Sequence, residues 1–348
     1  MKKIRVGDRV IGDGEPCFII AEAGSNHNGD FEQARRLIEV AARAGADAVK
    51  FQVFRASRLY PRNAGISDYL KVNRSIYDII AEMEMPYEWL PELAKVCRDH
   101  KVLFTASVFD EESADRVDPY VEVFKIASYE MTHIPLLRYV ASKGKPVIMS
   151  TGTAELHEVA TSVAEFEATG NAALALMQCT ASYPAPIASL NVRAIVTMKT
   201  TFGCPVGLSD HSRDPLVGPL TAIGVGANLI EKHYTLGNEL PGPDHRFAVE
   251  PTELCVMVDR IRNAEQALGS GAKVMDPIEA ELRAFARRSV FAVRDIGPGE
   301  PLTPENIAVL RCGAQRGGFA PRDFTSLLGR KAARLIAAET AVTADDIA

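Results

Sequence analysis

The feature that most constrains this fold is a strand-then-helix pattern that repeats eight times along the first two thirds of the chain. Between the strands lie amphipathic segments such as 30–44, 88–99 and 155–167. The strands are continuous apolar runs, which indicates burial on both faces. The eight predicted strands cover residues 18–22, 48–52, 102–107, 123–128, 146–151, 173–179, 205–210 and 228–233. Eight such units in roughly 250 residues predict an α/β fold of the (β/α)8 TIM-barrel type.

A doubly wound open sheet is the alternative that the same pattern allows. Sheets of that kind usually carry a glycine-rich phosphate loop after the first strand. Neither GxGxxG nor GxxxxGK[ST] is present in the sequence. The pattern therefore favours the closed barrel.

The pattern changes after a helix predicted over 251–268. A charged stretch, 276–288, is typical of a helical linker, and 288–293 alternates like an exposed strand. Gly297-Pro298-Gly299 predicts a tight turn, followed by a short helix over 304–308 and a short strand over 309–311. We therefore expect a barrel domain over 1–270, a linker over 271–286 and a small separate domain over 287–348.

Composition narrows the class of partner. The chain has 348 residues, of which 47% are hydrophobic, and a formal net charge of −6. This balance argues against nucleic acid or an anionic membrane as the main partner. The six cysteines contain no CxxC pair, the N-terminus turns polar at once, and glycines and prolines interrupt the longest apolar run, 215–230. These features predict a cytoplasmic protein with reduced thiols and no membrane span.

Two histidines follow neighbouring predicted strands, and they predict a metal site. His211 follows the strand over 205–210, and His233 ends the next strand. One βα step separates them, so both imidazoles should emerge at the same end of the barrel. Two imidazoles there could bind a divalent metal while leaving positions for water and substrate.

Polar residues at the carboxyl ends of the strands predict an anion-binding pocket, because barrel chemistry occurs at that end. Lys50 and Lys125 lie inside apolar strands, where a buried cation needs a compensating anion. Glu22 ends the first strand and is the candidate acid or base. This rim would present Glu22, Lys50, Gln52, Thr105, Ser107, Lys125, Ser128, Ser150, Thr151, Ser209, His211, Lys232 and His233. Two cations and a ring of hydroxyls are typical of a site for a small phosphorylated or carboxylated molecule.

Several long motifs, in order, resemble the sialic acid synthases and their relatives that make legionaminic and pseudaminic acid. The similarity covers essentially the whole chain, including Gly207-Leu208-Ser209-Asp210-His211-Ser212. Further matching segments are 18–29, 45–52, 124–128, 149–152, 179–184, 231–236 and 242–245. Residues 288–330 resemble the antifreeze-like (SAF, β-clip) domain of these enzymes.

The resemblance implies a metal-dependent condensation of phosphoenolpyruvate with the open-chain aldehyde of a 2-acetamido sugar, which releases phosphate. His211 and His233 would bind Mn²⁺, or Mg²⁺ or Co²⁺ in its place, and Glu22 would transfer protons. By position, the residues that grip phosphoenolpyruvate would be Lys50, Thr105, Lys125, Ser128, Ser150 and Ser209, and the sugar-side contacts would be Gln52, Glu130, Tyr183 and Asp244.

The same resemblance implies a domain-swapped homodimer in which Arg311 reaches the partner's site and binds the sugar's N-acetyl group. N-acetylmannosamine is the expected acceptor. Ala181, where an asparagine is usual, leaves a legionaminic- or pseudaminic-type synthase, acting on a 2,4-diacetamido-6-deoxy hexose, as an alternative. A Schiff-base aldolase using Lys50 or Lys125 as the nucleophile is a second alternative.

Overall fold

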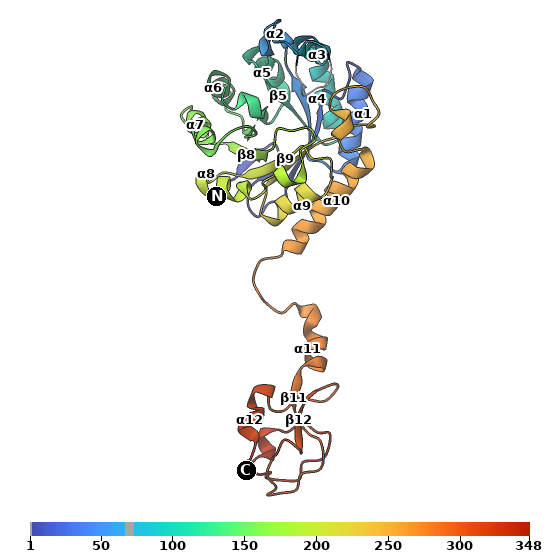
Figure 1. Cartoon of the computed structure of the whole chain (residues 1–348), viewed down its shortest axis with the longest axis vertical. Helices are drawn as coiled ribbons and strands as arrows, with labels where there is room; N and C mark the ends of the chain where they lie inside the picture. Colours follow the sequence, from blue (N-terminus) through green and yellow to red (C-terminus); the bar gives the residue numbers. More distant parts are fainter. Residues whose placement is uncertain (1, 67–72) are drawn as a thin grey trace. The chain divides into compact units, whose positions relative to one another are not determined.

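A closed barrel of eight parallel strands forms the first part of the chain (Figure 1). The computed structural model describes residues 2–66 and 73–348. The barrel strands are β3 (Phe18–Gly24), β4 (Ala48–Val53), β5 (Leu103–Val108), β6 (Phe124–Ile126), β7 (Val147–Ser150), β8 (Leu174–Cys179), β9 (Val206–Asp210) and β10 (Leu229–His233). Pairing of β10 with β3 closes the barrel. The predicted TIM barrel is confirmed, and the open sheet is excluded.

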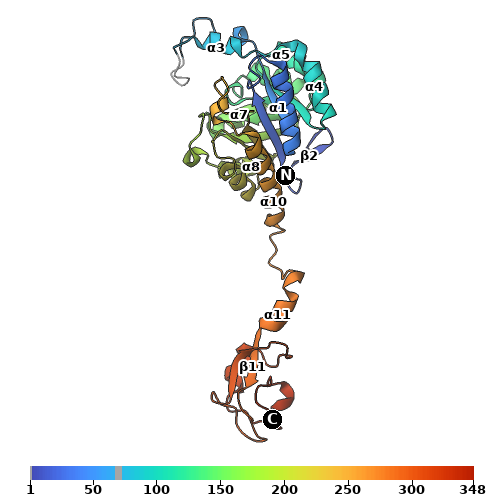
Figure 2. The same cartoon turned by 90° about the vertical axis from the view of Figure 1, so that its right-hand side faces the viewer.

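Helices surround the strands, and Figure 2 shows α1 and α4 side by side on the outside of the barrel. The helices of this part are α1 (Phe31–Ala44), α2 (Ala56–Leu59), α3 (Ile76–Glu82), α4 (Leu90–Asp99), α5 (Glu111–Val117), α6 (Ile134–Ser142), α7 (Leu156–Glu167), α8 (Ala194–Phe202), α9 (Val217–Gly224) and α10 (Pro251–Leu268). Short 3₁₀ turns are η2 (Tyr87–Trp89), η3 (Asp118–Tyr120), η4 (Ser128–Glu130), η5 (Ile187–Ser189) and η6 (His245–Phe247). In α1, Asp30 caps the first turn and Gly45 ends the helix in the left-handed conformation.

The interior of the barrel has an apolar floor. Alternate strand residues face inward, so Phe18 and Ile20 share one face with Glu22 further along β3. The floor is formed by Phe18, Ile20, Ala48, Val123, Ile148, Ala175, Met177 and Leu229. A hairpin that the sequence analysis missed, β1 (Ile4–Val6) and β2 (Arg9–Ile11), packs Ile4, Val6 and Ile11 against this floor. The barrel is therefore filled at the amino ends of its strands.

Gly207 allows β9 and β10 to approach each other inside the barrel. A Cβ at this position would lie 2.2 Å from the carbonyl oxygen of Leu229. We therefore expect Gly207→Ala to lower the free energy of unfolding by about 3 kcal/mol, measured by urea denaturation. Gly224→Ala is the matched control, since no atom beyond its chain neighbours and its own helix backbone lies within 4 Å of its Cβ position. Equal stability of the two variants would contradict this account of the close approach.

The contacts divide the chain into two compact units, Met1–Gly269 and Ser270–Ala348. The second contains η7 (Pro277–Glu279), α11 (Ala280–Ala286), β11 (Arg288–Ala292), β12 (Ile307–Arg311), η8 (Pro321–Asp323), α12 (Phe324–Leu327) and η9 (Ala344–Asp346). Strands β11 and β12 pair in antiparallel fashion over a small core that includes Val290, Ile307 and Val342. The short helix expected over 304–308 is wrong. Asn306 instead closes a turn by accepting from Thr303 N, and the chain enters β12 directly.

The sequence predicted reduced cysteine thiols and no membrane span. The six cysteines are free, and all except Cys255 are buried. Within the described residues, no helix is both long enough and apolar enough to cross a lipid bilayer.

Candidate active site

Four charged side chains are buried together above the apolar floor of the barrel. Glu22, Lys50, Lys125 and Glu231 are each at most 4% exposed. Lys50 Nζ lies 3.4 Å from Glu22 Oε2 and 3.1 Å from Glu231 Oε2, and Lys125 Nζ lies 4.0 Å from Glu231 Oε1. We call these four residues the charged layer.

The two carboxylates of the charged layer differ in proton affinity. Burial raises the pKa of Glu22 to about 7, although Lys50 opposes the shift. Burial acts in the same direction on Glu231, but Lys125, Lys50 and the Ser209 hydroxyl outweigh it and lower its pKa to about 2. Glu231 is therefore the structural counter-ion, and Glu22 is the carboxylate able to exchange a proton near neutral pH.

The lysines of the charged layer also differ. Burial alone would lower the pKa of Lys50, but the Glu22 and Glu231 carboxylates raise it above its ordinary value. Burial lowers the pKa of Lys125 to about 8, because Glu231 is more distant from it. Lys125 is therefore the cation that an incoming anion would stabilise most.

Glu231 is a site residue that the sequence analysis missed. It accepts a hydrogen bond of 2.8 Å from Ser209 Oγ and pairs with Lys50. A signal was available, because Glu231 precedes His233 by two residues and inward-facing side chains recur every second residue along a strand.

The predicted hydroxyls lie around the two lysines. Ser150 Oγ accepts from Lys125, Ser209 donates to Glu231, and Ser128 Oγ accepts from Gly152 N at 3.0 Å. The Thr105 hydroxyl donates to Val123 O at 2.8 Å, and its contact with phosphoenolpyruvate stays a prediction. Ser107, noted only as a rim residue, contacts Lys50 Nζ at 3.2 Å.

The two histidines meet as predicted. The ring centroids of His211 and His233 are 5.3 Å apart, and Tyr183 stacks on His211 at 4.2 Å. His211 Nδ1 lies 3.0 Å from the carbonyl of Thr180, so this nitrogen carries the hydrogen. Burial lowers the pKa of His233 well below its ordinary value, and its Nδ1 is buried without a hydrogen-bond partner among the described residues.

These donors fit a divalent metal as two ligands of a partly open site. A neutral imidazole with an unpaired nitrogen is a metal ligand, and the Thr180 contact orients the other ring as second-shell partners do. Asp244 Oδ2 lies 3.9 Å from His233 Nδ1. Across the described residues, no group of three or more His, Cys, Asp and Glu side chains is arranged to hold a metal. The remaining ligands would therefore be water and substrate oxygens.

Two of the four residues expected on the sugar side, Gln52 and Asp244, lie near Gly24. A Cβ on Gly24 would lie 3.5 Å from Glu22 Oε1 and 3.6 Å from both Gln52 Nε2 and Asp244 Oδ2. Gln52 donates to Glu22 at 3.1 Å, so it also orients the proton-exchanging carboxylate. Burial raises the pKa of Asp244 to about 6.

Glu130 is buried in η4, directly after Ser128. Burial raises its pKa to about 7, and its Oε2 has no hydrogen-bond partner among the described residues. A buried oxygen without a partner is costly, so this carboxyl has capacity for a ligand.

One predicted residue is placed differently, and the role of another stays a prediction. Lys232, expected at the rim, instead bonds to Asp210 Oδ2 at 2.7 Å and to the carbonyls of Ser212 and Asp214, so it fixes the segment that follows β9. Arg311 ends β12 in the second unit and is exposed. Its contact with the barrel site stays a prediction.

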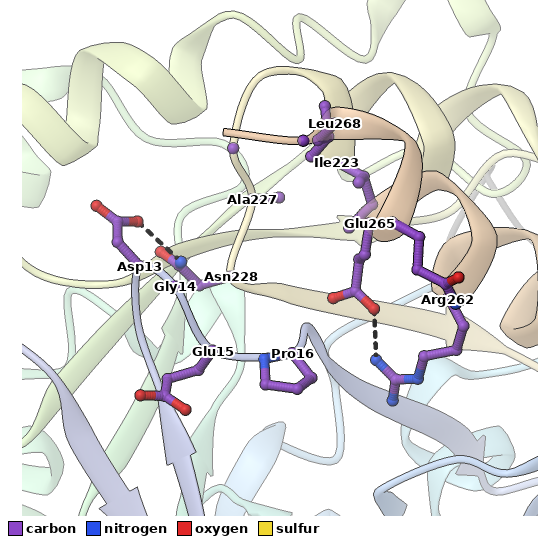
Figure 3. A pocket seen from close by; sticks show the side chains of 13 residues that line it. Asp13, Gly14, Glu15, Pro16, Ile223, Ala227, Asn228, Arg262, Glu265 and Leu268 are labelled. Atoms are coloured by element: carbon purple, nitrogen blue, oxygen red, sulfur yellow. Dashed lines mark hydrogen bonds and ion pairs between the residues drawn. The ribbon is translucent and has the colours of Figure 1, made fainter. Parts of the chain in front are cut away.

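Another pocket, of about 560 Å³, lies at the opposite ends of the strands (Figure 3). Asp13, Pro16 and Asn228, which precede β3 or β10, line it together with Arg262 and Glu265 of α10. Dashed lines in Figure 3 mark the pairing of Arg262 with Glu265 and of Asp13 with Asn228, so these groups satisfy one another. None of the predicted site residues lies there.

Comparison with known proteins identifies the family of the chain. Residues 37–273 match the NeuB family, and residues 287–348 match the SAF domain. The chain belongs to the NeuB family. The family match spans β4 to β10 and therefore includes both histidines and three of the four residues of the charged layer.

Relatives of this NeuB-family chain are similar over nearly its whole length. The Bacillus subtilis spore coat polysaccharide biosynthesis protein SpsE is 43% identical, over 100% of this chain and 98% of the relative. The Legionella pneumophila N,N'-diacetyllegionaminic acid synthase is 38% identical, over 94% of each chain. The structure of N-acetylneuraminic acid synthetase from Leptospira borgpetersenii, in complex with citrate, covers 81% of this chain and 95% of that one, at 34% identity and a TM-score of 0.74.

Proposed function

We propose that the protein condenses phosphoenolpyruvate with the aldehyde of an N-acetylated amino sugar, giving a 2-keto acid and phosphate. The observation that carries this proposal is the charged layer directly below two convergent imidazoles. An anion with a reactive carbon would bind at Lys50 and Lys125, and an aldehyde would lie above it at His211 and His233. The names of the relatives, legionaminic acid synthase and N-acetylneuraminic acid synthetase, support the same reaction class.

The chain's residues would bind, orient and exchange protons. Lys50, Lys125 and Ser150 hold the phosphate and carboxylate of phosphoenolpyruvate, whose C3 forms the new carbon–carbon bond with the aldehyde carbon. The aldehyde carbonyl opens to an alkoxide in that step; water then adds at C2, and Glu22 accepts its proton and passes it to the alkoxide. The C2 hydroxyl loses its proton and becomes the keto group as the carbon–oxygen bond to phosphate breaks, and the electron pair leaves with the phosphate, which takes up that proton and is stabilised by the lysines.

His211 and His233 would hold a divalent metal, most simply Mn²⁺. When bound, such a metal supplies a Lewis acid for the aldehyde oxygen. Cys179, at 3.7 Å, raises the pKa of His211 against the effect of burial, so a metal competes with a proton for this imidazole.

The proposal also concerns the identity of the acceptor sugar. N-acetylmannosamine is the simplest sugar that satisfies the sequence expectation. Two 2,4-diacetamido-6-deoxy hexoses are alternatives, because Ala181 stands where an asparagine is usual. The relative at 38% identity is named for a product with two acetyl groups, which supports these alternatives.

Phosphate release tests the reaction directly. We expect release from phosphoenolpyruvate that requires both Mn²⁺ and an acceptor, and that a chelator abolishes. His233→Ala should lower kcat by about 10²-fold or more and weaken Mn²⁺ binding in calorimetry. Arg260→Met, at an exposed position on α10, is the control and should change neither. Metal-independent release in the wild type would contradict the assignment.

A Schiff-base aldolase is the second candidate, and the pKa of Lys125 near 8 favours it. Borohydride with a ketone or aldehyde substrate would then attach the substrate covalently to Lys125. We expect no such adduct, since Ser150 and Glu231 engage this lysine. Mass spectrometry of the treated protein separates the two mechanisms.

We infer a homodimer in which the second unit supplies Arg311 in trans. The segment before β11 supports this, because Ile278, Leu282 and Phe285 are 88%, 64% and 53% exposed at helical spacing. An apolar stripe of that kind is typical of a surface that a partner covers.

Leu282→Glu with Phe285→Glu should therefore shift the protein from dimer to monomer in light scattering and reduce turnover. Val196→Glu, at an exposed apolar position on α8, is the matched control. Mixing Arg311→Ala with Glu22→Gln protein should restore part of the activity that each lacks, because a mixed dimer contains one intact site. A monomeric wild type, or no recovery on mixing, would contradict the exchange of Arg311.

A further inference from the structure

His245 is a buried histidine that the proposed reaction does not use. It lies in η6, in the segment that follows β10, and is fully buried. Its two ring nitrogens face different parts of the chain. Nδ1 lies 2.6 Å from the Thr235 hydroxyl, just after β10, and Nε2 lies 3.1 Å from Asn28 Oδ1, in the turn after β3. The imidazole therefore bridges the segment beyond His233 and the turn beyond Glu22.

The turn after β3 provides a fixed point for this bridge. Asn26 Nδ2 donates to Tyr234 O at 2.8 Å, and Gln33 Nε2 of α1 donates to Asn26 O at 2.6 Å. Asn28 has a φ of 51°, in the left-handed region that asparagine adopts more readily than most residues. Its side chain is thus presented to His245 by a turn that is held both at the end of β10 and at α1.

The segment after β10 folds closely around the bridge. Gly242 has a φ of 134°, and a Cβ there would lie 2.9 Å from His245 Cδ2 and 3.1 Å from Asn28 Oδ1. Asn238 Nδ2 donates to the carbonyls of His245 and Ala248, which closes the segment on itself. The backbone around His245 is therefore tied to the turn and has little room to shift.

Asp244, the residue before His245, relies on this bridge for its position. Its Oδ2 lies 3.9 Å from His233 Nδ1, and it shares the surroundings of Gly24 with Gln52. No described side chain donates a hydrogen bond to the Asp244 carboxylate, so the backbone that carries it sets its place. A sugar whose aldehyde lies at the two histidines would present its neighbouring hydroxyls to this carboxylate.

We propose that His245 is a positioning residue, which holds Asp244 against the acceptor sugar by bridging Thr235 and Asn28. The inference rests on the proposed function and adds to it a residue that touches neither substrate. A neutral imidazole suits this task, because Nε2–H donates to Asn28 while Nδ1 accepts from the Thr235 hydroxyl. Accurate placement matters, since a displacement of about 1 Å in a site can cost about 10²-fold in rate.

The test measures KM separately for phosphoenolpyruvate and for the acceptor. The acceptor is whichever of N-acetylmannosamine and the two 2,4-diacetamido-6-deoxy hexoses the wild type turns over fastest. His245→Ala should raise the acceptor KM by about tenfold or more and keep the phosphoenolpyruvate KM within about twofold of wild type. Asn171→Ala is the matched control, because it removes hydrogen bonds to the carbonyls of Ala141 and Lys145 before β8, away from the site. It should lower stability and change neither KM.

Two substitutions at Asn28 test the bridge from its other end. Asn28→Gly keeps the left-handed backbone but removes the acceptor oxygen, so it should reproduce the effect of His245→Ala. The double variant should be no worse than either single variant, because both remove the same bridge. Asn28→Asp keeps an acceptor oxygen and should keep the acceptor KM close to the wild-type value.

Three results would overturn the inference while leaving the proposed function intact. These are an unchanged acceptor KM in His245→Ala, equal increases in both KM values, or equal KM values in Asn28→Gly and Asn28→Asp. Absence of phosphate release by the wild type with every acceptor would instead overturn the proposed function and, with it, this inference. Asn28 is exposed, so its variants should fold and decide the matter even if His245→Ala does not fold.

Discussion

Glu22→Gln should lower kcat by about 10²–10⁴-fold, because the amide cannot accept the proton of the attacking water. The variant keeps the shape of the side chain and its contact with Gln52, so binding of phosphoenolpyruvate should remain measurable by calorimetry. With the pKa of Glu22 at about 7, wild-type kcat/KM should fall as pH drops below 7. Steady-state phosphate release across pH 5.5 to 9 checks both statements.

The residual activity of Glu22→Gln should lack this acidic limb. The control is Glu158→Gln, which changes a carboxylate at the start of α7, on the outside of the barrel. Gln33→Glu is unsuitable as a control because Gln33 is buried. Glu158→Gln should keep the wild-type pH profile. Turnover by Glu22→Gln within a few-fold of wild type would exclude Glu22 as the base.

The same carboxyl affects stability in a defined direction. Its pKa is raised from 4.5 when unfolded to about 7 when folded, so the folded state holds the proton more tightly. On account of this group, the free energy of unfolding falls as pH rises from about 4.5 to 7. Glu22→Gln removes this contribution, and its stability relative to wild type should therefore increase over that range.

Lys232→Met should lower the free energy of unfolding by about 3–5 kcal/mol, because it leaves Asp210 buried without its cation. Lys232 is 1% exposed and Asp210 is fully buried, and the lysine also satisfies two carbonyls of the segment that carries His211. Urea denaturation measures the loss. Any folded fraction should bind Mn²⁺ more weakly, since that segment positions His211.

An exposed ion pair provides the control for Lys232. Arg138 is paired with Glu165, with side chains 58% and 29% exposed. Arg138→Met should change stability by no more than about 1 kcal/mol. Similar losses of unfolding free energy in the two variants would show that the buried Lys232–Asp210 pair stabilises the fold no more than an exposed pair does.

The barrel could be predicted because its signal is local. Apolar runs at regular spacing specify the eight strands, and polar residues at the strand ends indicate which face is functional. The hairpin β1–β2 was missed because its two strands are three residues each, too short for an alternating pattern to stand out in the sequence. The short helix at 304–308 failed because Asn306 stabilises a turn through contacts that propensity does not register.

The sequence predicted which residues lie in the candidate site better than it predicted what each of them contacts. His211, His233 and both lysines lie together as the spacing indicated. The sequence analysis missed Glu231 because a single glutamate next to a lysine and a histidine is a common pattern at protein surfaces. Lys232 was assigned to the rim because the sequence alone does not determine which of two adjacent residues faces inward.

The filled amino-terminal end of the barrel has a consequence for the order of events in turnover. Within the described residues, Ile4, Val6 and Ile11 pack against the floor and cover the amino-terminal end of the barrel, so a substrate would reach the charged layer from the carboxyl ends of the strands. Lys50 and Glu231 lie two residues deeper along their strands than Gln52 and His233. A sugar at the histidines would therefore cover whatever lies below it. Kinetics should be ordered, with the enol phosphate entering first, and phosphate should be trapped until the nine-carbon product has departed.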